Sequence, residues 1–66
     1  MLNVGFICVG NSCRSQMAEG FGRYYGKGLM DVYSAGTKPA DKINKAAIEV
    51  MKEIGINLNI QFPKLL

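Results

Sequence analysis

A short apolar run near the start of the chain passes through a few turn-forming residues into a segment with helical spacing. Residues 2–9 are rich in strand formers, and Gly10-Asn11-Ser12 closes the run with turn chemistry. From Ser15 onward, apolar side chains recur at intervals of four, three and one, at Met17, Phe21, Tyr24 and Tyr25. We therefore expect a buried first strand that leads directly into a helix, with Gly26 or Gly28 as its left-handed stop.

The predicted first helix has an aromatic side and a polar side. Gln16, Glu19 and Arg23 fall on faces other than the apolar one. Tyr24 and Tyr25 are expected to pack against the fold or to line its rim, and not to form a platform for a substrate.

A second strand and a second helix follow. Residues 31–35 predict a short strand that ends at Gly36. Apolar spacing then marks an amphipathic helix, which Gly55 terminates and whose apolar positions are Ile43, Ala46, Ala47, Val50 and Ile54. Asp41 and Asn44 are both suitable N-caps, and the sequence does not choose between them. A strand joined through a helix to the next strand predicts a parallel pair with a right-handed crossover.

The size of the chain limits what this pair can become. Its 66 residues allow one small domain, 1–66, with a thin core. Residues 56–66 alternate like a strand in their first half, but Pro63 argues against a long central strand. Two parallel strands make a poor sheet alone. We therefore expect that another chain completes this one through its exposed apolar surface, or that it is the amino-terminal half of something longer.

Composition narrows the function classes. No apolar run approaches the ~20 residues that cross a bilayer, so no membrane association is expected. The net charge of +3 comes from scattered Lys and Arg residues, which does not favour nucleic-acid binding. The two cysteines are too few for a secreted disulfide framework and fit the reducing cytoplasm. Nucleotide-binding glycine signatures are missing, and we expect neither a metal nor a cofactor.

The segment between the first strand and the first helix has the chemistry of an anion site. A helix amino terminus offers unpaired N–H groups and the positive end of the macrodipole, so a loop that wraps there can cradle an anion. Gly10 would let the backbone approach closely, and Asn11 tolerates a left-handed conformation. The residues expected to bind the oxyanion are Val9, Gly10, Asn11, Ser12, Cys13 and Arg14.

Within this loop, three residues are the catalytic candidates. Such a cradle stabilises a thiolate, so Cys8 is predicted to be a nucleophile. The planar fork of Arg14 matches two oxygens of a phosphate-like group, and the hydroxyl of Ser15 can donate to the sulfur. Cys13 leaves two interpretations open, a small loop residue packed beneath the site or a redox partner of Cys8.

The pattern Cys-x5-Arg-Ser between a strand and a helix resembles the motif of low-molecular-weight tyrosine phosphatases. The string Cys-Val-Gly-Asn-Ser-Cys-Arg-Ser-Gln-Met-Ala-Glu-Gly, residues 8–20, is most similar to the thioredoxin-coupled arsenate reductases of the same fold. Phosphatases of this family usually have Pro at the position of Gln16. Similarity continues through residues 32–37 and 45–53. The resemblance implies a parallel, three-layer α/β fold, of which this chain covers the amino-terminal βαβα portion.

The resemblance also implies a function. An arsenate reductase is the favoured interpretation; a protein tyrosine phosphatase, or a non-catalytic oxyanion-binding fragment, is the alternative. The implied partners are arsenate, phosphate or a phosphotyrosine-like oxyanion, and thioredoxin. In the family an Asp-Pro loop supplies a general acid, whereas neither Asp31 nor Asp41 precedes Pro here. Reductases of this type use two further cysteines, and this chain has none after Cys13, which in the family can form a reversible disulfide with the nucleophile.

Overall fold

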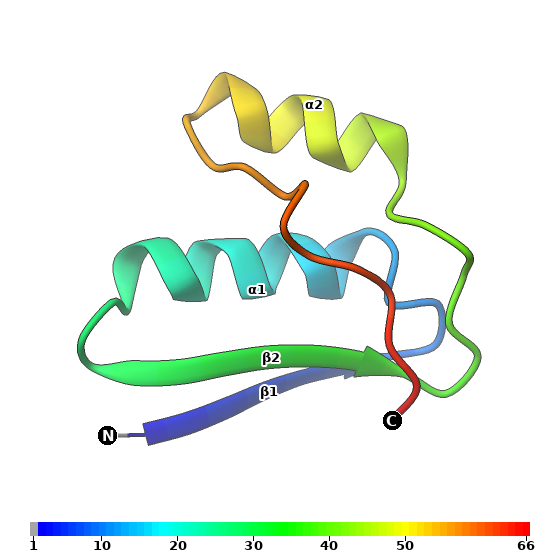
Figure 1. Ribbon diagram of the computed structural model, residues 1–66, viewed down its shortest axis with the longest axis horizontal. Coiled ribbons are helices and arrows are strands. Elements are labelled where there is room, and N and C mark those ends of the chain that lie inside the picture. Colours follow the sequence, from blue (N-terminus) through cyan, green and yellow to red (C-terminus); the bar gives the residue numbers. More distant parts are fainter. Residues whose placement is uncertain (1) are drawn as a thin grey trace.

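The computed structural model describes residues 2–66, and in them the chain forms a strand, a helix, a strand and a helix (Figure 1). These elements are β1 (Leu2–Cys8), α1 (Arg14–Tyr25), β2 (Met30–Gly36) and α2 (Lys45–Glu53). β1 and β2 pair in parallel, from Leu2 opposite Met30 to Cys8 opposite Gly36. The predicted order and the parallel pairing are confirmed, and the α/β class with them.

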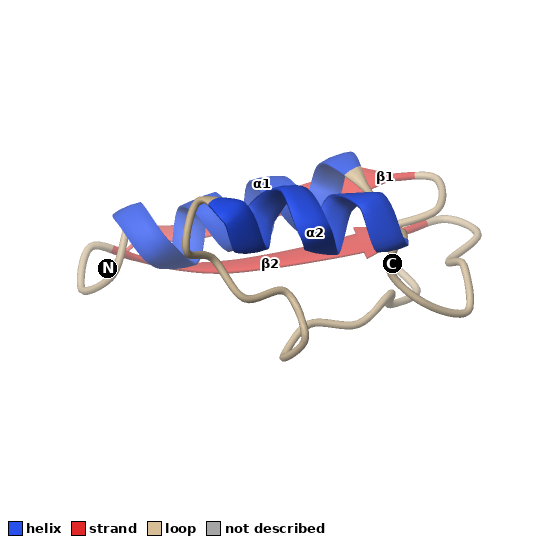
Figure 2. Cartoon of the chain, turned by 90° about the horizontal axis from the view of Figure 1, so that it is seen from above, coloured by secondary structure: helices blue, strands red, loops and turns tan. Residues whose placement is uncertain are grey.

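The layers are stacked on one side of the sheet. α1 packs on β1 and β2, and α2 packs on α1 (Figure 2). In the described residues no helix covers the other face of the sheet. Side chains of β1 consequently alternate between exposed and half-buried, and Ile7 is 47% exposed. The expectation of a buried first strand was wrong for this chain, because neither α1 nor α2 packs against that face.

α1 packs mainly through small and polar residues, and of its predicted apolar positions only Met17 packs against the core cluster in the described residues. Its buried residues are Ser15, Gln16, Glu19, Gly20 and Gly22. A Cβ added at Gly22 would lie 2.8 Å from Val32, and one at Gly20 would lie 2.8 Å from Leu58. These glycines let the helix approach its neighbours too closely for a large side chain, so the aromatic residues cannot occupy this face.

The aromatic side of α1 faces outward. Tyr24 and Tyr25 are 57% and 70% exposed, and Phe21 is 38% exposed. The rings of Phe21 and Tyr25 stack with centroids 6.1 Å apart, so these residues pack mainly on one another. Gly26 caps the helix with φ −98°, and Gly28, at φ 83°, is the left-handed residue in the turn that follows.

The core lies between α2, α1 and the segment after α2. It comprises Ile43, Ala47, Met51, Ile56 and Leu58. Asn44 is the N-cap of α2, since its Oδ1 accepts from the N–H groups of Ala46 and Ala47. Val50 and Ile54, which were predicted on the buried face, are about half exposed.

The last residues do not form a strand of the sheet. Ile56 and Leu58 are buried in alternation, as predicted, but a turn follows them at residues 59–60. The chain then reaches the end of β2, where Gly36 and Leu65 form an isolated parallel bridge. Among the described helices, none has the length and apolar character needed to cross a membrane.

Candidate oxyanion-binding site

The predicted loop lies where β1 ends and α1 begins. Residues 8–14 line a hollow of about 350 Å³ at this edge of the sheet. Asn11 has φ 50°, the left-handed conformation expected from its residue type. The structure therefore brings all the residues of the predicted loop together around one hollow.

The carbonyl groups of the loop are bound from outside. The N–H groups of residues 37–44 donate to them: Thr37 to Cys8 O at 3.1 Å, Lys38 to Val9 O at 2.9 Å, Ala40 to Gly10 O at 2.9 Å and Asn44 to Ser12 O at 2.6 Å. Within residues 2–66, the N–H groups of Gly10, Ser12 and Cys13 donate no hydrogen bond to the chain. An anion in the hollow would satisfy these donors.

Cys8 Sγ receives hydrogen bonds from its own loop. The Asn11 N–H donates to it at 3.0 Å, and Ser15 Oγ lies 2.8 Å away. Ser15 Oγ in turn accepts from Asn11 Nδ2 at 2.9 Å, which favours the orientation in which the Ser15 hydroxyl donates to the sulfur. Donors directed at a sulfur stabilise its anionic form, the form that acts as a nucleophile.

Asn11 is held by a buried amide network that the sequence did not indicate. Gln16 Nε2 donates to Asn11 O at 2.9 Å and lies 3.0 Å from Asn11 Oδ1. Gln61 Nε2 donates to Gln16 O at 2.9 Å and Oε1 at 2.8 Å. Gln16 was predicted to lie on a face of the helix other than the apolar one, yet its side chain is fully buried. Hydrophobic periodicity identifies buried positions by their apolar side chains. It therefore could not have identified Gln16, which is polar, as a buried residue.

Glu19 forms a second buried group below the loop. It is 1% exposed, accepts a hydrogen bond from Ser34 Oγ and pairs with Arg23 at 2.8 Å and Lys64 at 3.5 Å. Burial alone would raise the pKa of Glu19, but the hydrogen bonds from Ser34 and Arg23 and the charges of Lys64 and Arg23 outweigh it. The pKa therefore lies below its usual range, and Glu19 is ionised at neutral pH.

Of the two glycines beside the loop, Gly36 and not Gly10 lies where a Cβ would meet other atoms of the chain at short distance. A Cβ at Gly36 would lie 2.3 Å from Val9 O and 3.1 Å from Asn11 Cβ. A Cβ at Gly10 would meet only Ser12 Oγ, at an ordinary 3.4 Å. The predicted close approach at Gly10 is therefore not required by contacts within the chain, and the close approach between strand and loop occurs at Gly36.

Arg14 and Cys13 occupy different surroundings. Arg14, the first residue of α1, lines the hollow, is exposed and makes no ion pair in the described part of the chain. Cys13 also lines the hollow but packs against the core cluster from its other side. Both Cys8 and Cys13 are free thiols. The guanidinium is thus available to an anion. The packing of Cys13 agrees with a small loop residue beneath the site, and its role as a redox partner of Cys8 stays a prediction.

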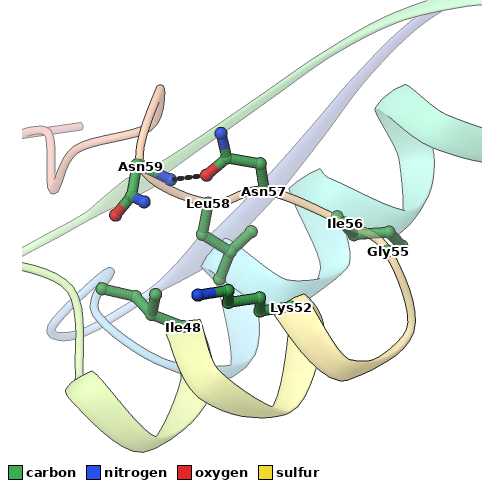
Figure 3. A pocket seen from close by; sticks show the side chains of 7 residues that line it. All are labelled: Ile48, Lys52, Gly55, Ile56, Asn57, Leu58 and Asn59. Atoms are coloured by element: carbon green, nitrogen blue, oxygen red, sulfur yellow. Dashed lines mark hydrogen bonds between the residues drawn. The ribbon is translucent and has the colours of Figure 1, made fainter.

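A second hollow, of about 320 Å³, lies between α2 and the segment that follows it (Figure 3). Ile48 and Leu58 line its apolar wall, and the Asn59 N–H donates to Asn57 Oδ1 at 2.8 Å. Lys52 is the one ionisable residue among those that line it, and the lining includes no cysteine, serine or threonine. We therefore assign the candidate site to the loop.

Comparison with known proteins gives the family. Residues 3–66 match the family model described as low molecular weight phosphotyrosine protein phosphatase. A curated arsenate reductase of Shouchella clausii is 49% identical over 61 residues, which are 92% of this chain and 43% of that protein. The chain therefore spans less than half the length of this relative.

Solved structures agree with this family. An arsenate reductase in the phosphate binding state superposes with a TM-score of 0.94 at 41% identity, over all of this chain and 50% of the other. A thioredoxin-dependent arsenate reductase of Corynebacterium glutamicum superposes with a TM-score of 0.95 at 39% identity, over all of this chain and 33% of the other. The chain belongs to the low molecular weight phosphotyrosine protein phosphatase family.

Proposed function

We propose that residues 8–15 bind arsenate or phosphate, and that Cys8 carries out the nucleophilic attack of an arsenate reductase-type protein. The orientation of the loop supports this proposal: its carbonyls accept from residues 37–44, and the N–H groups of Gly10, Ser12 and Cys13 have no partner among residues 2–66. Cys8 lines the same hollow. Such preorganised donors stabilise an oxyanion without reorganisation during the reaction. Similarity to arsenate reductases supports arsenate as the substrate class.

In the first step, the Cys8 thiolate attacks arsenic and displaces one oxygen as hydroxide, leaving a covalent sulfur–arsenic bond. The N–H groups of the loop and Arg14 hold the remaining oxygens. The hydroxyl of Ser15 and the N–H of Asn11 stabilise the sulfur before attack. All of these proposed roles fall to residues 8–15, of which residues 8–14 line the hollow.

Reduction needs a second thiol. If Cys13 attacks Cys8 Sγ of the adduct, the sulfur–arsenic bond breaks, a disulfide forms and arsenic leaves with two more electrons as arsenite. A dithiol protein such as thioredoxin would then reduce the disulfide. Because Cys13 packs against the core, we expect this step to be inefficient in the 66-residue chain. We propose the cytoplasm as the location, because free thiols that need a dithiol reductant fit a reducing compartment.

Phosphatase activity is the second candidate. The same hollow accepts a phosphoryl group, and the family model is that of a phosphatase. The residues that line the hollow, 8–14, include no carboxylic acid. A general acid contributes ~10²–10⁴-fold, so we expect slow hydrolysis, confined to aryl phosphates with good leaving groups. Binding without turnover is the remaining alternative.

Turnover by the purified chain distinguishes these alternatives. We expect slow release of phosphate from an activated aryl phosphate, lost in Cys8→Ser and retained in Cys13→Ser. Arsenate reduction with thioredoxin, thioredoxin reductase and NADPH should stay at the background set by Cys8→Ser. Sustained reduction by the wild-type chain would show that Cys8 and Cys13 suffice, and equal hydrolysis by wild type and Cys8→Ser would exclude Cys8 as the nucleophile.

A further inference from the structure

The last residues of the chain contact the loop and α1 on their way to the sheet. They cross α1 and end beside the carboxyl end of β2 (Figure 1). The Lys64 N–H donates to Asn11 Oδ1 at 2.8 Å, and Lys64 O accepts from the Gly36 N–H at 2.7 Å. Lys64 is thus bonded through its backbone to both the loop and the strand that supports it.

The side chain of Lys64 fixes the same segment to α1. Its Nζ donates to Phe62 O at 2.8 Å and lies 3.5 Å from Glu19 Oε1. Arg23 pairs with the other carboxylate oxygen of Glu19, which is 1% exposed. A buried carboxylate is costly without opposite charge beside it. The ammonium of Lys64 therefore has a specific buried partner, unlike an ordinary surface lysine.

Asn11 connects this ion pair to the nucleophile. Its Oδ1 accepts from the Lys64 N–H, its own N–H donates to Cys8 Sγ, and its Nδ2 donates to Ser15 Oγ. A shift of residues 61–64 would take the Lys64 N–H away from Asn11 Oδ1 and leave it with Gln16 Nε2 alone, at 3.0 Å. The left-handed conformation of Asn11, which aims its N–H at the sulfur, would then be held less firmly.

We propose that Lys64 is a positioning residue for the oxyanion-binding loop: its ion pair with Glu19 holds the final segment against α1, so that its backbone N–H fixes Asn11. Lys64 touches neither Cys8 nor the hollow and acts through Asn11. The inference rests on the proposed function, because positioning matters to the site only if the loop binds an oxyanion.

The test compares Lys64→Met with Lys27→Met, which removes the same charge from an exposed lysine. Amide exchange of Asn11 is measured without any anion, and phosphate affinity is measured by protection of Cys8 from iodoacetamide. We expect Lys64→Met to speed Asn11 exchange and to weaken phosphate binding by about tenfold, the change that corresponds to one charge-assisted hydrogen bond. Lys27→Met should change neither. An unchanged Asn11 exchange rate, or faster exchange throughout α1 and α2, would overturn the proposal.

A double-mutant cycle with Glu19→Gln tests the route through the ion pair. In the Glu19→Gln background, adding Lys64→Met should change phosphate affinity by less than about twofold. An equal effect in both backgrounds would contradict a role through Glu19. If the wild-type chain shows no phosphate protection while Asn11 exchange still depends on Lys64, the proposed function fails and the positioning role stands.

Discussion

Asn11 makes contacts in three directions at once. Its N–H reaches Cys8 Sγ, its amide group reaches Ser15, and its oxygens accept from Gln16 and from the Lys64 N–H. All of its polar groups are engaged although it is fully buried. A buried polar network of this kind stabilises one conformation only when every member is satisfied. The shape of the loop therefore depends on residues up to 53 positions away.

Arg14 is expected to bind the oxyanion with a full positive charge, whereas the N–H groups of the loop offer only partial charges. Arg14→Ala should weaken arsenate or phosphate binding by roughly ten- to a hundredfold, because charge-assisted hydrogen bonds contribute ~1.5–3 kcal/mol each. The anion affinity of Arg14→Lys should fall between those of the wild type and Arg14→Ala, since an ammonium keeps the charge but loses the bidentate geometry. Equilibrium titration with phosphate or arsenate measures these affinities. Lys42→Ala is the control variant, because Lys42 is exposed and lies outside the hollow. Equal affinities for wild type and Arg14→Ala would remove Arg14 from the site.

Glu19 should make the fold sensitive to acid. Because its pKa is lower in the folded chain than its ordinary value of ~4.3, its contribution to stability is complete above that value. The contribution is lost as pH falls through the folded pKa. Urea unfolding from pH 7 to pH 3 should therefore show a steeper loss for wild type than for Glu19→Gln. Glu49→Gln, which changes an exposed glutamate on α2, is the control and should lose stability with pH as the wild type does. Parallel stability curves for the wild type and Glu19→Gln would contradict this role of Glu19.

At the scale of elements, the junction between β2 and the loop should tolerate no side chain. Gly36→Ala places a Cβ against Val9 O, so we expect loss of anion binding together with destabilisation of ~1–3 kcal/mol. Gly28→Ala is the matched control: its Cβ meets nothing within 4 Å, but φ 83° costs about 1 kcal/mol of strain. Gly28→Ala should lose stability and keep anion affinity. Gly36→Ala with wild-type affinity would show that the strand does not set the loop.

The helices and strands could be predicted where neighbouring residues in the sequence determine them. Alternating apolar runs, turn residues and helical spacing predicted β1, α1, β2 and α2 in order, and the loop was recognised because its chemistry lies within residues 8–15. The buried face of α1 was not predictable from spacing. Gly20 and Gly22 pack closely, and Gln16 is satisfied by Gln61, 45 residues away. Hydrophobic periodicity carries no information on such distant polar partners.

At the scale of the whole molecule, the sheet leaves one face and its edges open in residues 2–66. Ile7 and Tyr33 lie on that face, and Leu29, Leu65 and Leu66 are each more than 60% exposed. Open strand edges and apolar surface favour pairing with another chain. This surface supports the prediction of self-association, which no contact in the structure tests.

Sedimentation velocity over a range of concentrations measures that association. We expect reversible oligomers or a partly folded monomer for the wild type, and a shift toward monomer for Ile7→Lys on the open face. Val50→Lys, about half exposed on α2, changes charge equally and should leave the distribution unchanged. A wild-type monomer with strongly protected amides throughout would show that the small core of this chain is sufficient alone.

The central claim is that residues 8–15 bind a tetrahedral oxyanion through their own N–H groups. A titration of the ¹⁵N-labelled chain with arsenate tests it most directly, with chloride at equal ionic strength as control. The account predicts saturable shifts of the Gly10, Ser12 and Cys13 amides with a single dissociation constant, and displacement of arsenate by phosphate. Shifts that fail to saturate, or that are spread over the exposed lysines while these amides stay unchanged, would contradict it.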